Sequence, residues 1–385
     1  MVHCHCNASE LIPARRAWQN RSAGVTVAGM NLRPSRFAAI LSLIVAAVFA
    51  SAALGIPRPP SRASLQIYFV DVEGGQATLF VTPDMHSLLI DTGWPGFNSR
   101  DADRIAVAAK AAGLDHIDYV LLTHYHVDHT GGVPQLVAKI PVKTFIDHGP
   151  NRETSDATTV QVAEAYQKVL GNGSYEHIVA HPGDTLPVPG MHITVVSADG
   201  NLIAQPLEGG GGENRYCASS EKRPADQTEN ARSLGVMITY GKQRILDLGD
   251  LTWDKEMELM CPVNKLGHID LLIVSHHGWS QSSSPALVNA ITPRVAIMDN
   301  GEKKGGSPSS WEIVDKAPGL EDLWQLHYSA EGGPTHNVDA ARIANLQGTD
   351  PGNYIKVTAY PNGELEVLNS RTGAVKKYSP KSPQE

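Results

Sequence analysis

The chain has 385 residues, of which 42% are hydrophobic and 19% are charged. These values are ordinary for a globular protein, so an intrinsically disordered chain is not the default expectation. The formal net charge of −8 disfavours tight binding of duplex nucleic acid, because phosphate contacts need Lys and Arg. The length allows one large domain or two of ordinary size.

The N-terminal region has the layout of an export signal. Arg33 and Arg36 precede an apolar run over residues 37–55, which contains Ala-Ser-Ala at 50–52. A basic segment, an apolar segment and an A-x-A site are together typical of a secretory signal peptide. An uncleaved run of about 18 residues would also be long enough to span a bilayer, so a retained anchor is the alternative.

These features predict where the chain is divided and where it is located. We expect translation to begin at Met30, which would make residues 1–29 a non-native extension. The protein is expected to be exported, periplasmic or secreted, with a single N-terminal membrane anchor as the alternative. The predicted segments are a signal peptide or anchor at 30–55, a Pro/Ser-rich linker at 56–64, a folded domain at 65–375 and a polar tail at 376–385.

The first half of the folded part alternates between strand and helix patterns. Period-two alternation and β-branched residues predict strands, whereas longer amphipathic stretches predict helices. In chain order we expect strands at 65–72, 77–83 and 86–93, a helix at 101–112, a strand at 117–124, a helix at 133–140, a strand at 142–149, a helix at 158–170 and a strand at 191–198.

The second half repeats this alternation after a polar insert at 205–229. The glycine run within the insert lacks the Lys-Ser/Thr of a phosphate loop, which predicts a flexible loop. Two runs of strands with helices interspersed predict an α/β fold, an αββα sandwich of two halves. We expect strands at 233–240, 244–250, 269–277, 294–300, 354–361 and 364–370, with helices at 253–260, 285–290 and 309–316.

Three histidines and an aspartate crowd the end of the predicted strand at 117–124. His124 and His126 share a face of extended backbone, so both can point to one metal ion. A tight bend then lets Asp128 and His129 reach a second ion beside it. Imidazole with carboxylate suits zinc, with manganese or iron as alternatives. The competing interpretation, a turn carrying surface histidines, does not explain this spacing.

The motif H-x-H-x-D-H resembles the signature of the metallo-β-lactamase superfamily. The resemblance covers roughly residues 65–370, including FVDVEGGQATL and LLIDTG. It implies the αββα sandwich of that family and a dinuclear metal centre. Asp250, in LDLGD, matches the carboxylate that bridges the two ions. His277, in SHHG, matches the last metal histidine and is preferred to His276 because the family places this ligand directly before Gly.

One ligand of the first metal ion is not identified by the motif. The family supplies a further histidine before the bridging carboxylate, but this chain has Asn230 in that region. His148 follows a strand in the same half and is our candidate for the ligand. The alternatives are Asn230 or water. Asp71 and Asp91 are expected to hold metal histidines in place through hydrogen bonds.

The order of motifs is most similar to the hydrolase domain of ComEC-type competence proteins. Two residues depart from that pattern: those proteins often carry Asp where this chain has His126, and a later G-H-P is Gly306-Ser307-Pro308 here. The missing histidine weakens transfer of the branch's function, and fold alone does not define function.

The resemblance implies a metallo-hydrolase with two metal ions, preferably zinc, that acts on phosphodiesters or other small anionic esters. The N-terminal pattern adds that this hydrolase is exported. Asp128 and Asp250 would be catalytic by orienting water and moving its proton. The alternatives are a β-lactam or lactone hydrolase, a single-stranded DNA nuclease, and a non-hydrolytic metal-binding or di-iron redox protein. The sequence does not predict the oligomeric state.

Two cysteines, Cys217 and Cys261, remain if the N-terminal region is removed. An oxidising compartment would allow them to pair, but sequence cannot show their separation. A disulfide and two free thiols are therefore both open.

Overall fold

The computed structural model describes residues 63–348 and 350–380. The expected extension at 1–29, the expected signal peptide or anchor at 30–55 and nearly all of the expected linker at 56–64 lie outside these residues. Among the helices of the described part, none is both long enough and apolar enough to cross a membrane.

Within the described residues, the first sheet has the strand order β20-β19-β18-β1-β2-β3-β4-β5-β6. Strand β1 pairs antiparallel with β2 and β18, whereas β3 to β6 run parallel. The parallel part brings the carboxyl ends of β3, β4 and β5 to one edge. The strands are β1 (Leu65–Phe69), β2 (Thr78–Val81), β3 (Ser87–Ile90), β4 (Ile117–Leu121), β5 (Val142–Asp147), β6 (Glu176–Val179), β18 (Ile355–Ala359), β19 (Leu365–Asn369) and β20 (Val375–Tyr378).

The second sheet has the order β17-β16-β15-β14-β12-β11-β8-β7, and β9 pairs with β8. Strands β12, β14, β15, β16 and β17 run parallel, which again gathers their carboxyl ends. The strands are β7 (Thr185–Leu186), β8 (His192–Ala198), β9 (Asn201–Leu202), β11 (Gly235–Tyr240), β12 (Gln243–Asp247), β14 (Leu271–Ile273), β15 (Val295–Met298), β16 (Asp322–His327) and β17 (Ile343–Asn345), with a separate pair β10 (Gly212–Glu213) and β13 (Val263–Asn264).

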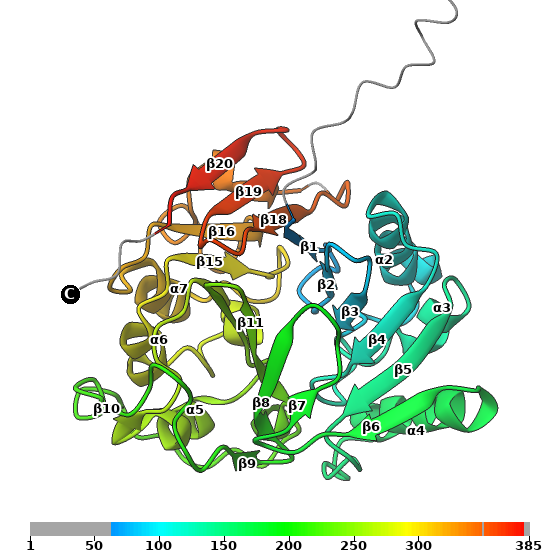
Figure 1. Ribbon diagram of the computed structural model, residues 1–385, viewed down its shortest axis with the longest axis horizontal. Helices are drawn as coiled ribbons and strands as arrows, with labels where there is room; N and C mark the ends of the chain where they lie inside the picture. Colours follow the sequence, from blue (N-terminus) through cyan, green and yellow to red (C-terminus); the bar gives the residue numbers. More distant parts are fainter. Residues whose placement is uncertain (1–62, 349, 381–385) are drawn as a thin grey trace, which may run out of the picture. The chain divides into compact units, whose positions relative to one another are not determined.

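Helices cover the outer faces of both sheets (Figure 1). The first sheet packs against α2 (Arg100–Ala111), α3 (Val133–Val137) and α4 (Ala157–Asn172), and the second against α5 (Trp253–Met260), α6 (Pro285–Ile291) and α7 (Pro308–Asp315). This is the αββα sandwich predicted from the sequence. Short 3-10 helices are η1 (Phe97–Ser99), η2 (Asn230–Arg232), η3 (Ser275–Gly278) and η4 (Ala340–Arg342).

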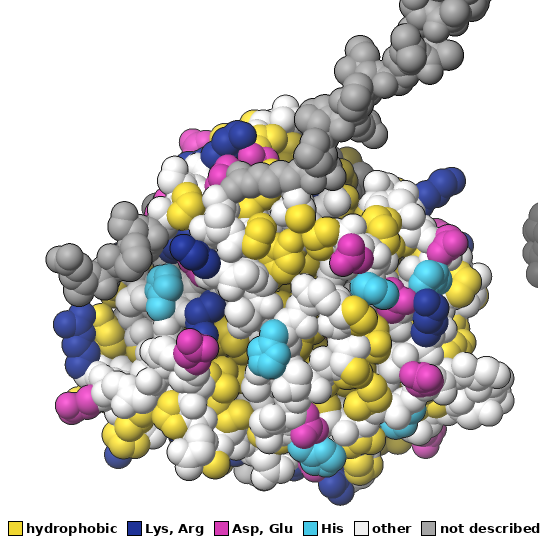
Figure 2. All heavy atoms as spheres, viewed as in Figure 1, with side chains coloured by type: hydrophobic (Ala, Val, Ile, Leu, Met, Phe, Trp, Pro, Cys, Tyr) yellow, Lys and Arg dark blue, Asp and Glu magenta, His cyan; other side chains and the backbone are white. Residues whose placement is uncertain are grey.

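Strand alternation produces the layers of the core. In β1, Leu65, Ile67 and Phe69 enter the apolar cluster between the two sheets, whereas Tyr68 enters the cluster beneath α2, α3 and α4. Successive strand residues face opposite sides, so one strand contributes to both clusters. On the face drawn in Figure 2, basic side chains lie dispersed among acidic, polar and apolar ones.

The boundary predicted after residue 375 falls inside a strand. Tyr378, in β20, is buried, and its hydroxyl donates to Asp322 Oδ2 at 2.6 Å while accepting from Trp324 Nε1 at 2.9 Å. The polar tail expected at 376–385 therefore contains structured residues at its start. The Lys-Lys pair of this short edge strand made its sequence resemble a solvated tail.

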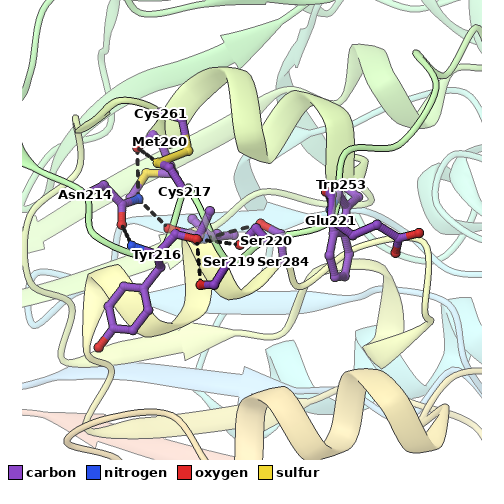
Figure 3. The surroundings of a disulfide bond; sticks show 12 residues. Asn214, Tyr216, Cys217, Ser219, Ser220, Glu221, Trp253, Met260, Cys261 and Ser284 are labelled. Carbon is purple, nitrogen blue, oxygen red and sulfur yellow. Dashed lines mark hydrogen bonds between the residues drawn. A yellow bond between two sulfur atoms is a disulfide. The ribbon is translucent and has the colours of Figure 1, made fainter.

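The polar insert, whose glycine run is expected to be a flexible loop, is tied to α5 (Figure 3). Cys217 and Cys261 form a disulfide with their Cα atoms 5.8 Å apart, which settles the choice between paired and free thiols. The Asn214 side chain donates to the carbonyls of Met260 at 2.9 Å and Ala286 at 2.8 Å. The insert is therefore anchored by covalent and hydrogen bonds.

Candidate metal centre

The candidate site lies at the carboxyl ends of parallel strands from both sheets. His124 to His129 follow β4, Asp250 follows β12 and His277 follows β14. Parallel pairing within each sheet places such strand ends on a common edge. Gly132 permits close packing behind the motif, because a Cβ there would lie 2.1 Å from the Thr92 carbonyl oxygen.

Four buried side chains from three loops form the centre of the site. One ligand atom from each of Asp128, His129, Asp250 and His277 lies within 4.8 Å of the other three. His129 Nε2 is 3.2 Å from both Asp128 Oδ2 and Asp250 Oδ2. His277 Nε2 is 3.2 Å from Asp128 Oδ2 and 3.5 Å from Asp250 Oδ1. The structure thus brings together four of the residues predicted as metal ligands.

His124 and His126 flank this cluster. His124 is fully buried, and its ring centroid lies 4.1 Å from that of His129. Its Nε2 is 3.9 Å from Asp250 Oδ2 and has no hydrogen-bond partner among the described residues. His126 lies beside His124 with ring centroids 4.7 Å apart, but its Nε2 contacts Glu153 Oε2 at 3.1 Å.

One carboxylate behind the cluster orients His129, and another lies near His277. His129 donates from Nδ1 to Asp91 Oδ2 at 2.7 Å, and His277 Nδ1 is 3.5 Å from Asp299 Oδ1. Asp91 also accepts from the Thr123 backbone N–H at 2.8 Å. A hydrogen bond on one ring nitrogen fixes the other as the ligand atom. Asp91 therefore has the contact expected for it.

Asp71 does not have the contact expected for it. Its Oδ1 accepts from His327 Nε2 at 2.6 Å, and its Oδ2 accepts from Arg104 at 3.0 Å. Asp71, Glu73 and His327 form a second group of potential ligands. The guanidinium of Arg104 already balances the charge of the Asp71 carboxylate in this group. We interpret this group as a buried ion-pair network that holds the loop after β1.

His148 lies outside the central cluster. Its Nε2 is 3.0 Å from Glu229 Oε2, and both side chains are buried. Asn230 is 8% exposed, and its Oδ1 has no hydrogen-bond partner within the described part of the chain. His276 Nε2 is 3.4 Å from Asp250 Oδ2, while its Nδ1 contacts Ser282 Oγ at 3.2 Å. His277 is a member of the four-residue cluster and His276 is not.

The charges within the cluster compensate one another. Burial would raise the pKa of Asp250, but the positive charge of His129 and its neighbours holds that pKa well below its usual range. Burial would lower the pKa of His129, but the carboxylates of Asp250 and Asp128 raise it well above its ordinary value. Burial and the charges of His129 and His126 lower the pKa of His124 well below its ordinary value. His124 is therefore a neutral imidazole available as a ligand.

This donor set fits divalent metal ions. Ionised carboxylates face imidazoles in a buried space, and a bound cation can replace the ring protons that balance them. Two buried atoms without hydrogen-bond partners among the described residues, His124 Nε2 and Asp250 Oδ1, are of the types that bind zinc. Asp128, His129, Asp250 and His277 would hold one ion, with His124 and Asp250 available to a second.

Sequence reasoning missed several residues around the cluster. Lys304 donates from Nζ to Asp128 Oδ2 at 2.5 Å, and Glu153 contacts His126. Lys304 follows β15, the strand next to β14, so its place could have been inferred from strand order once that order was known. The separation of 176 residues between Lys304 and Asp128 gives no local signal.

Part of the chain is similar to the metallo-β-lactamase superfamily. Residues 70–209 match the family described as "Metallo-beta-lactamase superfamily", which confirms the resemblance based on the histidine motif. The match and the two-sheet architecture together define an αββα sandwich of the metallo-β-lactamase type.

Two curated relatives support the resemblance to competence proteins. Recombination protein 2 of Haemophilus influenzae is 24% identical over 243 residues, which are 63% of this chain and 25% of the relative. Competence protein ComA of Neisseria gonorrhoeae is also 24% identical over 243 residues, 63% of this chain and 28% of the relative. The aligned region thus spans about a quarter of the length of either relative.

Among solved structures, the chain is similar to the metallo-beta-lactamase fold protein YhfI from Bacillus subtilis. The match has 14% identity and a TM-score of 0.42, and it covers 68% of this chain and 95% of that chain.

Proposed function

We propose that the protein is an exported metal-dependent hydrolase that acts on phosphodiesters or other small anionic esters. The observation that carries this proposal is the convergence of Asp128, His129, Asp250 and His277, with one ligand atom from each within 4.8 Å of the others. Two zinc ions are the proposed cofactor, with manganese or iron as alternatives, because imidazole and carboxylate ligands suit these metals.

The side chains would divide the work as follows. Metal ions held at this site would supply Lewis-acid activation of water and of the ester oxygen. Asp250 and Asp128 orient the attacking water and accept its proton, because both carboxyl groups remain ionised at neutral pH. His129 and His277 would bind the ion beside these carboxylates. The burial of all four groups limits access of bulk water.

The experiment compares wild type with Asp250→Ala, each loaded with zinc or manganese. Hydrolysis of bis(p-nitrophenyl) phosphate is expected to fall by about 10²–10⁴-fold, together with metal content, while the far-UV circular dichroism spectrum is retained. Asp84→Ala is the matched control, since Asp84 is exposed in the turn between β2 and β3, away from the strand ends that carry the site. Full activity in Asp250→Ala would overturn the assignment.

The same proteins separate the alternative functions. Hydrolysis of nitrocefin or of a lactone, but not of the phosphodiester, would support a β-lactam or lactone hydrolase. Salt-sensitive cleavage of single-stranded DNA would support a nuclease, whereas the formal net charge of −8 does not favour tight duplex binding. Redox-active iron without hydrolysis would support a di-iron redox protein.

Export is supported by two observations of different kinds. The basic and apolar pattern of residues 30–55 is typical of a signal peptide or anchor. The Cys217–Cys261 disulfide fits an oxidising compartment. N-terminal sequencing of the protein recovered from the periplasm or medium would test cleavage, and recovery of the full chain only in the cytoplasm would contradict export.

A further inference from the structure

We propose that Lys304 determines specificity by binding the anionic oxygen of the substrate's ester group next to the metal centre. This inference rests on the proposed hydrolase function, and it names a residue that the metal motif does not include. It follows from the contacts of the Lys304 ammonium group, its surroundings and the charge balance of the site.

The loop after β15 places Lys304 firmly at the site. The Lys304 carbonyl accepts from the Gly301 N–H at 2.8 Å, and the Gly306 N–H donates to the His277 carbonyl at 2.9 Å. Gly305 allows the loop to approach the metal histidine, because a Cβ there would lie 2.2 Å from the His277 carbonyl oxygen. The loop that carries Lys304 is thus packed directly on a cluster residue.

The ammonium group of Lys304 has donor capacity to spare. It donates to Asp128 Oδ2 at 2.5 Å and to the Gly74 carbonyl at 2.7 Å. Among the described residues, the hydrogen bonds of Lys304 Nζ reach these two acceptors. An ammonium group has three N–H donors, so one donor is left for another acceptor. The side chain is 19% exposed, so the group can be reached from solvent. A further acceptor can therefore come from a bound molecule.

Two indole rings flank the same group. The ring centroids of Trp94 and Trp279 lie 5.6 Å and 5.4 Å from Lys304 Nζ, within the range of cation–π attraction. Trp94 is fixed by its backbone N–H, which donates to Asp101 Oδ2 at 2.8 Å, and Trp279 packs edge-on against the His276 ring. These partly buried rings reduce solvent around Nζ, which strengthens its interaction with an anion.

The charge balance makes this lysine important. The cluster and the carboxylates behind it, Asp128, Asp250, Asp91 and Asp299, offset the positive charge of the divalent ions that the site would hold. Among the ion pairs of the described part, Lys304 is the only Lys or Arg that pairs with a member of the cluster. A cation bound by Asp128 would compete with Lys304 for Oδ2. The ammonium released in this way is placed to donate to the anionic oxygen of a phosphoester or similar ester.

The first experiment measures binding, so it does not depend on turnover. Calorimetric titration of the zinc-loaded full chain with inorganic phosphate should give a dissociation constant about ten- to a hundredfold higher for Lys304→Met than for wild type. Lys304→Arg should recover most of the affinity, because it restores the charge. Lys303→Met is the matched control and should bind like wild type, since Lys303 is exposed on the same loop.

Metal content measured on the same samples distinguishes loss of phosphate binding from loss of zinc. Lys304→Met should retain its zinc, because the four cluster residues are unchanged; Lys304→Gln provides a second uncharged variant if the first does not fold. Equal phosphate affinity in wild type and both uncharged variants would overturn the proposal. Absence of phosphate binding by zinc-loaded wild type would also overturn it.

The second experiment compares two esters with the same leaving group. Lys304→Met should raise KM for the anionic bis(p-nitrophenyl) phosphate by about tenfold or more, with a much smaller effect on the neutral p-nitrophenyl acetate. Equal losses on both esters would contradict a role in recognising the anion. If wild type hydrolyses neither ester, the proposed hydrolase function fails, whereas the phosphate titration still decides the role of Lys304.

Discussion

The His129 Nδ1–H group donates a hydrogen bond to Asp91 Oδ2 at 2.7 Å, and both side chains are fully buried. Asp91 follows β3 and His129 follows β4, so the parallel pairing of these two strands brings donor and acceptor together. Since Nδ1 is occupied, Nε2 is directed to Asp128 and Asp250. This contact links the packing of the first sheet to the chemistry of the site.

The contact predicts the effect of Asp91→Asn. The amide keeps the size of the side chain but no longer fixes the ring orientation by a charged acceptor, so metal affinity should fall by about 10- to 100-fold. Competition with a chromophoric chelator measures the affinity, and Asp84→Asn is the exposed control. Unchanged affinity in a folded Asp91→Asn variant would show that this bond does not orient His129.

Adjacent histidines allow a second, matched test. His277 Nε2 reaches both Asp128 and Asp250, whereas His276 Nε2 reaches Asp250 and its Nδ1 contacts Ser282. His277→Ala should therefore lose bound metal, and His276→Ala should retain most of it. Inductively coupled plasma mass spectrometry of the two purified variants measures the difference. The opposite ranking would assign the ligand to His276.

Local sequence patterns predicted the architecture and the centre of the site. Both the strand pattern and the histidine motif can be recognised from a few neighbouring residues. Strand periodicity located most inner strands but missed β16, whose six residues are all buried and so show no alternation of buried and exposed positions. The histidine motif required only one tight turn. The family resemblance then pointed to Asp250 and His277, which the fold brings next to Asp128. Short strands such as β7 and β9 were missed because two residues carry no measurable period.

Contacts between distant segments could not be predicted in this way. Glu153 and Lys304 reach the motif from other loops, and their positions depend on how the strands are ordered. His148 illustrates the same limit. It follows β5, which is paired with β4 and so ends on the expected edge, but its ring contacts Glu229. No pattern in the sequence indicates that carboxylate as its partner.

The placement of His148 yields a prediction that separates stability from metal binding. In His148→Ala, Glu229 loses a hydrogen bond in a buried environment, so the free energy of unfolding should fall by about 1–3 kcal/mol. Metal content should stay at the wild-type value, because the central cluster is unchanged. Urea unfolding and metal analysis measure the two effects. Loss of metal from a folded variant would instead support His148 as a ligand.

The disulfide predicts a separate contribution to stability. Cys217 and Cys261 close a loop with a sequence separation of 44, and closing such a loop restricts the unfolded chain. Cys217→Ser combined with Cys261→Ser should lower the free energy of unfolding by about 2–4 kcal/mol. Urea unfolding of wild type with and without reductant is the control. Identical unfolding curves for oxidised and reduced protein would contradict this contribution.

Glu256 predicts how stability depends on pH. Its carboxyl group is fully buried on α5 and accepts from the backbone N–H groups of Ser283 at 2.8 Å and Ser284 at 2.6 Å. Burial raises its pKa to about 7 despite these bonds, compared with 4.5 for the ordinary side chain. Between these two pKa values the folded chain holds a proton that the unfolded chain has lost.

The contribution of Glu256 is therefore present below about pH 4.5 and is lost as the pH rises through about 7, which makes the protein less stable by roughly 3 kcal/mol. Glu256→Gln cannot ionise and should lack this component, whatever its stability at low pH. Urea unfolding of both proteins at several pH values between about 5 and 8 gives their difference in unfolding free energy. That difference should shift in favour of Glu256→Gln as the pH rises. A difference that stays constant across this range would mean that Glu256 titrates near its ordinary pKa in the folded protein.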